Sequence, residues 1–186
     1  MFDFQNRLYV TRHGETDYNI QKKFQGWIDI PLNQHGIQQA HSAAALWKKQ
    51  GIIFDVCITS DMQRTRETAK ILSKYIDIHT SIENPLLREI NMGKQEGLTR
   101  EEYFKTYPYS NPIKHLNEKF IDGESYDEFS KRIEQFLLEI YEKYADKKIL
   151  LVTHGGSMRV IRSILKNIAL EEIIDTEIQN LEYHIY

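Results

Sequence analysis

Two short apolar runs of the chain end in nearly the same way. Residues 8–14 read LYVTRHG, and residues 150–156 read LLVTHGG. Each run has the composition of a buried strand and is followed by a histidine and a glycine. If the two strands are parallel neighbours, both histidines lie at one edge of the sheet, where glycines let backbone N–H groups approach a ligand closely. The matched endings therefore predict a parallel sheet with an anion-binding site at its carboxyl edge.

The rest of the chain alternates between strand and helix patterns. Runs rich in β-branched and aromatic residues predict strands at 8–11, 55–59, 149–153 and 182–186. A helical pattern spans 33–50 and stops at Gly51, and another follows Gly156. Strands separated by helices of this length pair in parallel through right-handed crossovers. We therefore expect an α/β fold, a three-layer sandwich with a mostly parallel central sheet.

Two further helices are predicted from capping boxes, in which a serine or threonine is followed three residues later by glutamate or glutamine. Ser60 with Gln63 opens one of them, and Ser125 with Glu128 opens the other. Apolar residues recur at helical spacing after each pair, which predicts one buried face for each helix.

Length and composition narrow the class of protein. The 186 residues suit a single compact domain, and with 41% hydrophobic residues and a formal charge of -3 a nucleic-acid partner is not expected. The N-terminus lacks the pattern of a signal peptide, and no apolar run reaches the ~20 residues that a membrane helix needs. The single cysteine, Cys57, lies in a strand-like run and is expected to be a buried thiol. We expect a cytoplasmic protein, monomeric or homodimeric, without a membrane partner.

Two arginines are expected near the histidines. Arg12 directly precedes the first histidine, and Arg64 falls in the first turn after a predicted strand. A guanidinium group matches two oxygens of a phosphate and keeps its charge at any working pH. The combination of strand-end histidines, glycines and arginines predicts a phosphate site.

The ordered set of motifs along the chain resembles the histidine phosphatase superfamily, in its branch typified by cofactor-dependent phosphoglycerate mutase. The resemblance covers nearly the whole chain. The matching positions are RHGET at 12–16 with Asn19, Gln25-Gly26, Asp29, Pro31-Leu32, Gly36, Gln39-Ala40, Ser60-Asp61, Arg64, Thr68-Ala69, Glu89, Gly93, Glu96-Gly97, GES at 123–125, Arg132 and VTHG at 152–155.

The resemblance implies a phosphoglycerate mutase-like fold and a catalytic role for five residues. His13 is expected to attack phosphorus as a neutral imidazole and to form a phosphohistidine. Arg12, Arg64 and His154 are expected to surround the oxygens of the transferring phosphoryl group. Glu89 is expected to protonate the leaving alcohol and then to accept a proton from water. Without the resemblance, Glu89 reads as an ordinary salt-bridge partner of Arg88.

The resemblance also implies further contacts to the phosphate. Asn19, Gln25 and Gly26 match a loop that contributes amide and backbone N–H groups, and Gly155 follows the second histidine. Positive charge from side chains makes a metal or another cofactor unnecessary, and no His-Glu-x-x-His spacing occurs. A small phosphorylated metabolite is the expected substrate.

Three functions remain open: a metal-independent phosphatase, a mutase-type phosphotransferase and a non-catalytic phosphate-binding module. A mutase must keep water from the phosphohistidine, which calls for an enclosing insertion and tail. The residues between Gly97 and Gly123 are few, and the chain ends directly after its last predicted strand, so we expect an open site and a phosphatase.

The segment 98–122 is expected to be a short lid that selects the substrate, inserted in a single domain covering 1–186. It mixes aromatic and basic residues, namely Tyr103, Phe104, Lys105, Tyr107, Tyr109, Lys114, His115 and Lys119. Each of these residues on its own reads as ordinary packing or as a solvated side chain.

Overall fold

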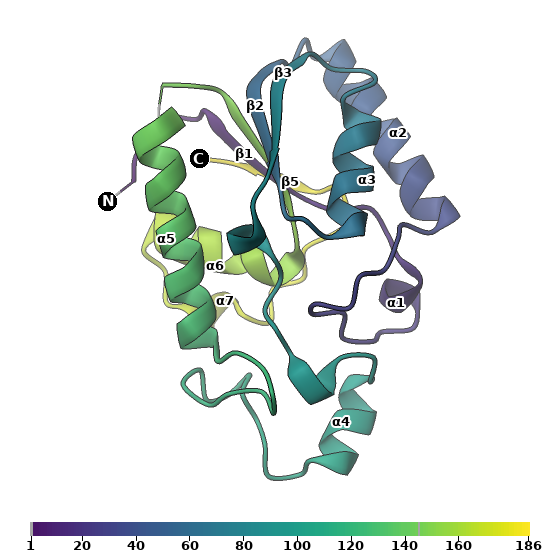
Figure 1. The fold of residues 1–186 in the computed structure, drawn as a ribbon, viewed down its shortest axis with the longest axis vertical. Coiled ribbons are helices and arrows are strands. Elements are labelled where there is room, and N and C mark those ends of the chain that lie inside the picture. The colour runs from purple at the N-terminus through teal and green to yellow at the C-terminus, as the bar shows by residue number, and fades with distance from the viewer. Residues whose placement is uncertain (1, 145) are drawn as a thin grey trace.

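A five-stranded sheet forms the middle of the molecule in a computed structural model that describes residues 2–144 and 146–186. The strands lie in the order β3-β2-β4-β1-β5 (Figure 1). They are β1 (Leu8–Arg12), β2 (Phe54–Thr59), β3 (Ile78–Glu83), β4 (Ile149–Thr153) and β5 (Tyr183–Ile185). The first four pair in parallel and β5 is antiparallel to β1, which confirms the mostly parallel α/β sheet.

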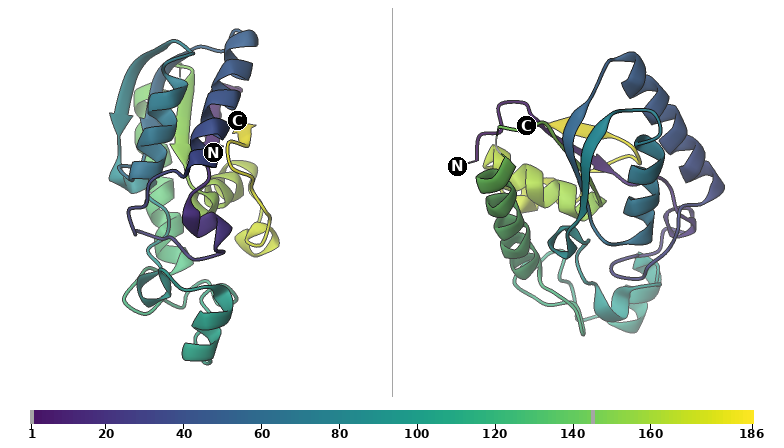
Figure 2. Two further views of the ribbon diagram at one scale, coloured as in Figure 1. Left: turned by 90° about the vertical axis from the view of Figure 1, so that its right-hand side faces the viewer. Right: turned by 45° about the horizontal axis from the view of Figure 1, so that its top comes forward.

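Helices cover both faces of the sheet (Figure 2). One face carries α2 (Gln34–Lys49) and α3 (Gln63–Leu72), and the other carries α5 (Tyr126–Tyr144), α6 (Gly155–Lys166) and α7 (Leu170–Ile173). The short helices α1 (Asp17–Ile20) and α4 (Arg100–Thr106) lie below the sheet in the view of Figure 1, and two 3₁₀ turns, η1 (Pro85–Leu87) and η2 (Gly93–Gln95), follow β3 along the chain. The two covered faces explain why the central strands are mainly apolar.

Strand β4 shows how the two halves of the core are built. Ile149 and Leu151 join the larger apolar cluster beneath α5 and α6, and Leu150 and Val152 join the cluster beneath α2. All four side chains are fully buried, because alternate residues of a strand point to opposite faces and helices cover both. This packing holds the carboxyl end of β4, where the second histidine follows, at a defined position.

Strand β3 was not predicted. It lies at the edge of the sheet, and four of its six side chains are exposed. Because Ile78 and Ile82 alone pack against the core, the segment lacks the apolar run that identifies a buried strand.

The helix boundaries test the predicted caps. Asn33 caps α2, with its side chain accepting a hydrogen bond from the Gly36 N–H, and Ser125 and Glu128 form the predicted capping box before α5. The capping box at Ser60 is wrong. Helix α3 begins at Gln63 after Met62, which provides no side-chain cap, and the Ser60 hydroxyl bonds to the side chains of His154 and Thr65.

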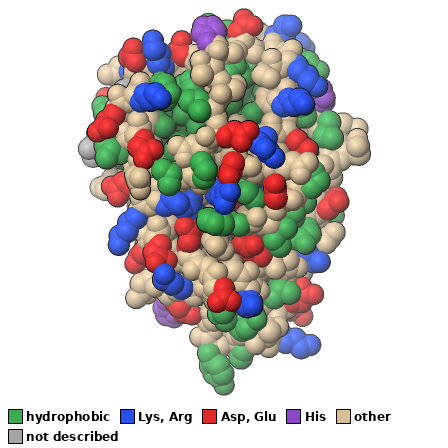
Figure 3. All heavy atoms as spheres, viewed as in Figure 1, with side chains coloured by type: hydrophobic (Ala, Val, Ile, Leu, Met, Phe, Trp, Pro, Cys, Tyr) green, Lys and Arg blue, Asp and Glu red, His purple; other side chains and the backbone are tan. Residues whose placement is uncertain are grey.

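Acidic and basic side chains are interspersed over the face of the molecule seen in Figure 3. In the described part of the chain, no helix has the length and apolarity needed to cross a bilayer.

Candidate active site

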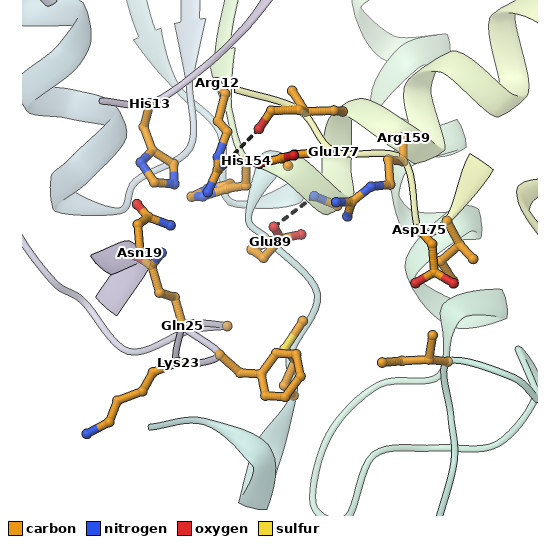
Figure 4. A pocket seen from close by; sticks show the side chains of 18 of the residues that line it. Arg12, His13, Asn19, Lys23, Gln25, Glu89, His154, Arg159, Asp175 and Glu177 are labelled. Carbon is orange, nitrogen blue, oxygen red and sulfur yellow. Dashed lines mark hydrogen bonds between the residues drawn. The ribbon is translucent and has the colours of Figure 1, made fainter. Parts of the chain in front are cut away.

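The carboxyl ends of β1 and β4 bring the two predicted histidines together. The strands are neighbours with Arg12 opposite Thr153, so His13 and His154 each follow directly at the same edge. Their ring centroids are 5.4 Å apart, and the residues are 2% and 1% exposed (Figure 4). Two hydrogen bonds hold the backbone of His13. Its N–H donates to the Thr153 carbonyl, and the Asn180 side-chain amide donates to the His13 carbonyl.

Hydrogen bonding determines which nitrogen of His13 carries its proton. Nδ1 lies 2.7 Å from the Gly14 carbonyl oxygen, which can only accept, so Nδ1 is the protonated nitrogen. Nε2 therefore keeps its lone pair. Burial, followed by the charges of Arg64 and Arg12, lowers the pKa of His13 well below its usual 6.5. A neutral imidazole with a free Nε2 is the form that a nucleophile requires.

Two arginines supply positive charge, of which Arg64 is buried and Arg12 partly buried. The Arg64 guanidinium donates to the carbonyls of Ile28 and Gly26 at 2.9 and 2.8 Å, and Arg12 donates to the Ile178 carbonyl at 2.6 Å. Burial lowers the pKa of Arg64 to about 10, which leaves it charged at neutral pH. The Arg12 Nε is buried without a partner among the described residues. A buried donor is costly to leave unsatisfied, so this atom indicates a place for an external acceptor.

His154 is held by two protein partners. Its Nδ1 accepts from Arg64 Nε at 3.2 Å, and its Nε2 donates to Ser60 Oγ at 2.8 Å. Because arginine can only donate, His154 is the Nε2-protonated tautomer. Burial first, and then the charge of Arg64, lowers its pKa well below 6.5. His154 therefore orients Arg64, and it needs a further proton before it can donate to a phosphate oxygen from Nδ1.

Glu89 lies in the same cavity as the two histidines (Figure 4). Its carboxylate accepts from the Gly156 N–H at 2.9 Å, in the first turn of α6, and from the Ile90 N–H at 3.0 Å. The neighbouring Arg88 pairs with Asp61 through a two-pronged contact, so it is not the partner of Glu89. The salt-bridge interpretation of Glu89 is thereby ruled out, and its carboxyl group is available to a ligand.

The loop that carries Glu89 is tied down from two sides. Arg132 donates to the carbonyls of Leu86, Arg88 and Glu89 at 2.7 to 3.1 Å, and it pairs with Glu124 through two bonds of 2.8 Å. The Trp27 indole N–H donates to the Glu89 carbonyl at 2.8 Å. These bonds fix the backbone on which the carboxyl group is mounted. The resemblance set included Arg132, but the sequence provided no reason for its presence.

The loop after the first histidine contributes amide groups. The Asn19 side-chain oxygen accepts from the Thr16 N–H at 3.0 Å, and the Gln25 oxygen accepts from the Thr16 hydroxyl at 3.0 Å. The amide nitrogens of both residues have no partner among the described residues and are free to donate. Gly26 has φ +48° and lies so close to Glu96 that a Cβ there would overlap the carboxylate. Glycine is therefore required at this turn.

One cavity of about 380 Å³ connects these groups. All the residues that the sequence analysis placed in the site line it, namely Arg12, His13, Asn19, Gln25, Gly26, Arg64, Glu89, His154 and Gly155. The cavity also has walls that the sequence did not predict, made by Arg100, Tyr126, Arg159, Ile174, Asp175 and Glu177. The position of Arg159 one turn into the helix after His154 was a usable signal, whereas residues 174–178 reach the cavity only through the tertiary fold.

The segment 98–122 contributes Arg100 and Ile113 to the cavity wall. The aromatic and basic residues singled out in this segment do not line it. Tyr103 is buried against Phe104 and Tyr107, and Tyr109 is 99% exposed. These rings therefore hold the segment together or face solvent, in agreement with their reading as ordinary packing.

Within the described residues, no group of three histidine, cysteine or acidic side chains is arranged to hold a metal ion. The positive charge that acts on the two histidines comes first from Arg64 and also from Arg12.

The comparisons with known proteins agree with this geometry. The family model of the histidine phosphatase superfamily (branch 1) matches residues 8–186. A Bacillus subtilis protein named Uncharacterized phosphatase PhoE is 32% identical over 82% of this chain and 73% of its own length. A Yersinia pestis protein named Probable phosphoglycerate mutase GpmB is 37% identical over 86% of this chain and 74% of its own length.

A solved structure extends the agreement to three dimensions. The structure of Bacillus stearothermophilus YhfR superposes with a TM-score of 0.80 at 27% identity, covering 96% of this chain and 94% of that one. The family match over nearly the whole chain and the shared architecture lead to one conclusion: the chain belongs to the histidine phosphatase superfamily, branch 1.

Proposed function

We propose that the protein hydrolyses small phosphomonoesters without a metal ion, through a phosphohistidine on His13. The observation that carries this proposal is the state of His13, whose Nδ1 is bonded to the Gly14 carbonyl, whose Nε2 is unprotonated, and whose ring lies within the influence of the charges of Arg64 and Arg12. Phosphatase-named relatives in the superfamily support hydrolysis.

The first step transfers the phosphoryl group to the enzyme. His13 Nε2 forms a bond to phosphorus while the bond from phosphorus to the ester oxygen breaks, and Glu89 gives its proton to the departing alkoxide. Arg12 and Arg64 neutralise the charge on the three remaining oxygens. The products are the free alcohol, a phosphohistidine and an ionised Glu89.

The second step reverses these roles. Glu89 takes a proton from a water molecule, whose oxygen attacks phosphorus as the bond to His13 Nε2 breaks. Inorganic phosphate leaves, and Glu89 is protonated for the next cycle. The mounting of Glu89 on a loop held by Arg132 and Trp27 suits a group that must act on both an alkoxide and a water at one position.

The experiment is to quench the enzyme during turnover of p-nitrophenyl phosphate and to measure acid-labile protein-bound phosphate. We expect such phosphate in the native enzyme and none in His13→Ala, which should lose nearly all turnover. Glu89→Gln should slow alkyl phosphates by about 10²-fold and the aryl ester much less, because nitrophenolate leaves without protonation. Substantial turnover by His13→Ala would refute the covalent step, and equal losses for both esters would refute the acid role.

A phosphotransferase is the second candidate, favoured by the relative named as a phosphoglycerate mutase. It differs from a hydrolase in the acceptor of the phosphoryl group. Measuring the ratio of inorganic phosphate to phosphorylated acceptor, with phosphoglycerate present and a bisphosphoglycerate primer added, separates the two. We expect inorganic phosphate to dominate.

A further inference from the structure

The cavity continues beyond the histidines into a second region, which we call the leaving-group end. It is defined by Arg100, Tyr126, Arg159, Asp175 and Glu177. Figure 4 shows Arg159 and Asp175 on the side of Glu89 away from His13, and Glu177 between Arg12 and Arg159. In an in-line displacement the leaving alcohol departs opposite the nucleophile. The alcohol part of a substrate attacked by His13 therefore occupies this region.

The leaving-group end holds equal numbers of positive and negative side chains. Arg100 and Asp175 form an ion pair at 3.8 Å, which joins α4 to the segment after α7. Arg159 uses its Nε to bind the Thr176 carbonyl at 2.7 Å, and it has no ion-pair partner among the described residues. Glu177 likewise has no ion-pair partner in the described part of the chain. Two arginines and two carboxylates give this region a net charge of zero.

The charge near the histidines is different. Arg64 is buried there and Arg12 is partly buried, and the one carboxyl group among them, Glu89, carries a proton when it acts as an acid. Two positive charges match a phosphomonoester dianion without help from the other region. Lys23 also lines the cavity, but its side chain leads away from it (Figure 4). Uncompensated positive charge is therefore found at the phosphate, whereas the charges of Arg100 and Arg159 are balanced in number by those of Asp175 and Glu177.

The negative charge of a carboxylate at the leaving-group end also acts on groups at the phosphate end of the cavity. Burial lowers the pKa of Arg12 overall, and the negative charges of Glu89 and, to a smaller extent, of Glu177 oppose this lowering. An additional carboxylate or phosphate on the alcohol would meet Asp175 and Glu177 as well as the arginines, and repulsion between like charges is a common basis of specificity.

Uncharged groups of a substrate find partners in the same region. The Tyr126 hydroxyl has no hydrogen-bond partner in the described residues, and the residue is 5% exposed and lines the cavity. Met92, Ile113 and Ile174 add apolar surface. A hydroxyl group and a carbon chain can both be accommodated here.

We infer that the enzyme selects phosphomonoesters whose alcohol carries no net charge, such as a polyol or a zwitterion, over those with an additional carboxylate or phosphate. The inference rests on the proposed phosphatase function and names the substrate class of that site.

Three small esters with the same carbon skeleton test the inference. Glycerol 3-phosphate has a neutral alcohol, O-phosphoserine a zwitterionic one, and 3-phosphoglycerate an alcohol with one negative charge. We expect kcat/KM for each of the first two to exceed that for 3-phosphoglycerate by about tenfold, the order of one charge repulsion in a partly hydrated site. Equal or better hydrolysis of 3-phosphoglycerate would overturn the inference.

A charge-removing variant tests the cause. Asp175→Asn combined with Glu177→Gln leaves Arg100 and Arg159 uncompensated, so the ratio of kcat/KM for 3-phosphoglycerate to that for glycerol 3-phosphate should rise about tenfold or more. Glu172→Gln, in α7 and outside the cavity lining, is the matched control and should leave the ratio unchanged. Because the readout is a gain in relative activity, a poorly folded variant cannot produce it.

The outcomes separate the inference from the function on which it rests. If native enzyme hydrolyses p-nitrophenyl phosphate but the double variant keeps the native ratio, the inference is wrong and the phosphatase function stands. If native enzyme hydrolyses none of the esters, the phosphatase function is wrong and the inference falls with it.

Discussion

At the scale of single residues, the site depends on close approaches that only small side chains permit. Gly156 donates its N–H to the Glu89 carboxylate, and a Cβ at this position would lie 2.3 Å from Glu89 Oε1. The sequence pattern predicts no function for this glycine. Its contact shows that it sets the distance between the first turn of α6 and the carboxyl group.

Gly156→Ala is therefore expected to displace Glu89 and to slow hydrolysis of glycerol phosphate by about 10²-fold. A loss of this size is typical when a catalytic group is displaced by ~1 Å. The aryl ester should be affected much less. The measurement is kcat for both esters in a cycle with Glu89→Gln. Because Gly156→Ala acts through Glu89, it should cause little further loss in the Glu89→Gln background. Additive losses would show that the glycine acts elsewhere.

At the scale of elements, α5 and the loop at 25–28 hold the segment that carries Glu89. Arg132 on α5 is mostly buried, with a side chain 14% exposed, and binds three carbonyls and Glu124. Lysine has the same charge but lacks the planar fork that makes these bonds at once. Trp27 adds one bond from the opposite side.

Arg132→Lys should lower the free energy of unfolding by about 2 kcal/mol, because buried carbonyls lose their donors. Arg132→Lys should also reduce turnover of alkyl phosphates more than turnover of p-nitrophenyl phosphate. Trp27→Phe should have the same effect on the two rates, but a smaller one. Urea unfolding and the ratio of the two rates are the measurements. Arg66→Lys is the control, because Arg66 forms only an exposed ion pair with Glu83 at 3.9 Å. It should change neither the free energy of unfolding nor the ratio of the two rates by much. Equal loss on both esters would limit Arg132 to a structural role.

At the scale of the whole molecule, the buried histidines make stability depend on pH. Both His13 and His154 have their pKa lowered well below 6.5, first by burial and then by Arg64. As the pH falls through 6.5, the unfolded chain takes up protons at these histidines and the folded protein does not. The free energy of unfolding therefore includes the full contribution of these two histidines above pH 6.5, and it declines below that pH.

The expected decline is about 1.4 kcal/mol per pH unit for each histidine, until the lowered pKa of the folded state is reached. Denaturant unfolding from about pH 7 down to about pH 5 measures it. His154→Gln should roughly halve the slope, and His115→Gln, with an exposed side chain, should leave it intact. Activity should persist below pH 6.5, since His13 stays neutral there. A flat stability profile over this range would contradict the burial of neutral imidazoles.

Much of the architecture could be predicted from local pattern. Strands β1, β2 and β4 are apolar because both faces are covered, and Asn33 and Ser125 cap helices through their own side chains. Edge strand β3 could not be predicted from the sequence because most of its side chains are exposed. The prediction for Ser60 was wrong because its hydroxyl bonds to the side chains of Thr65 and His154 and not to the backbone N–H of Gln63, and His154 is 94 positions away in the sequence.

The sequence by itself determined the chemical groups of the site. Histidines, glycines and arginines placed at strand ends must meet at one edge once the strands pair in parallel, and the family motifs identify Glu89 among many acids. Only the tertiary structure decided the protonation of each histidine, the support of Glu89 by Arg132 and the charge of the leaving-group end. These depend on contacts such as that of Arg100 with Asp175, between segments whose positions are set by packing and not by local pattern.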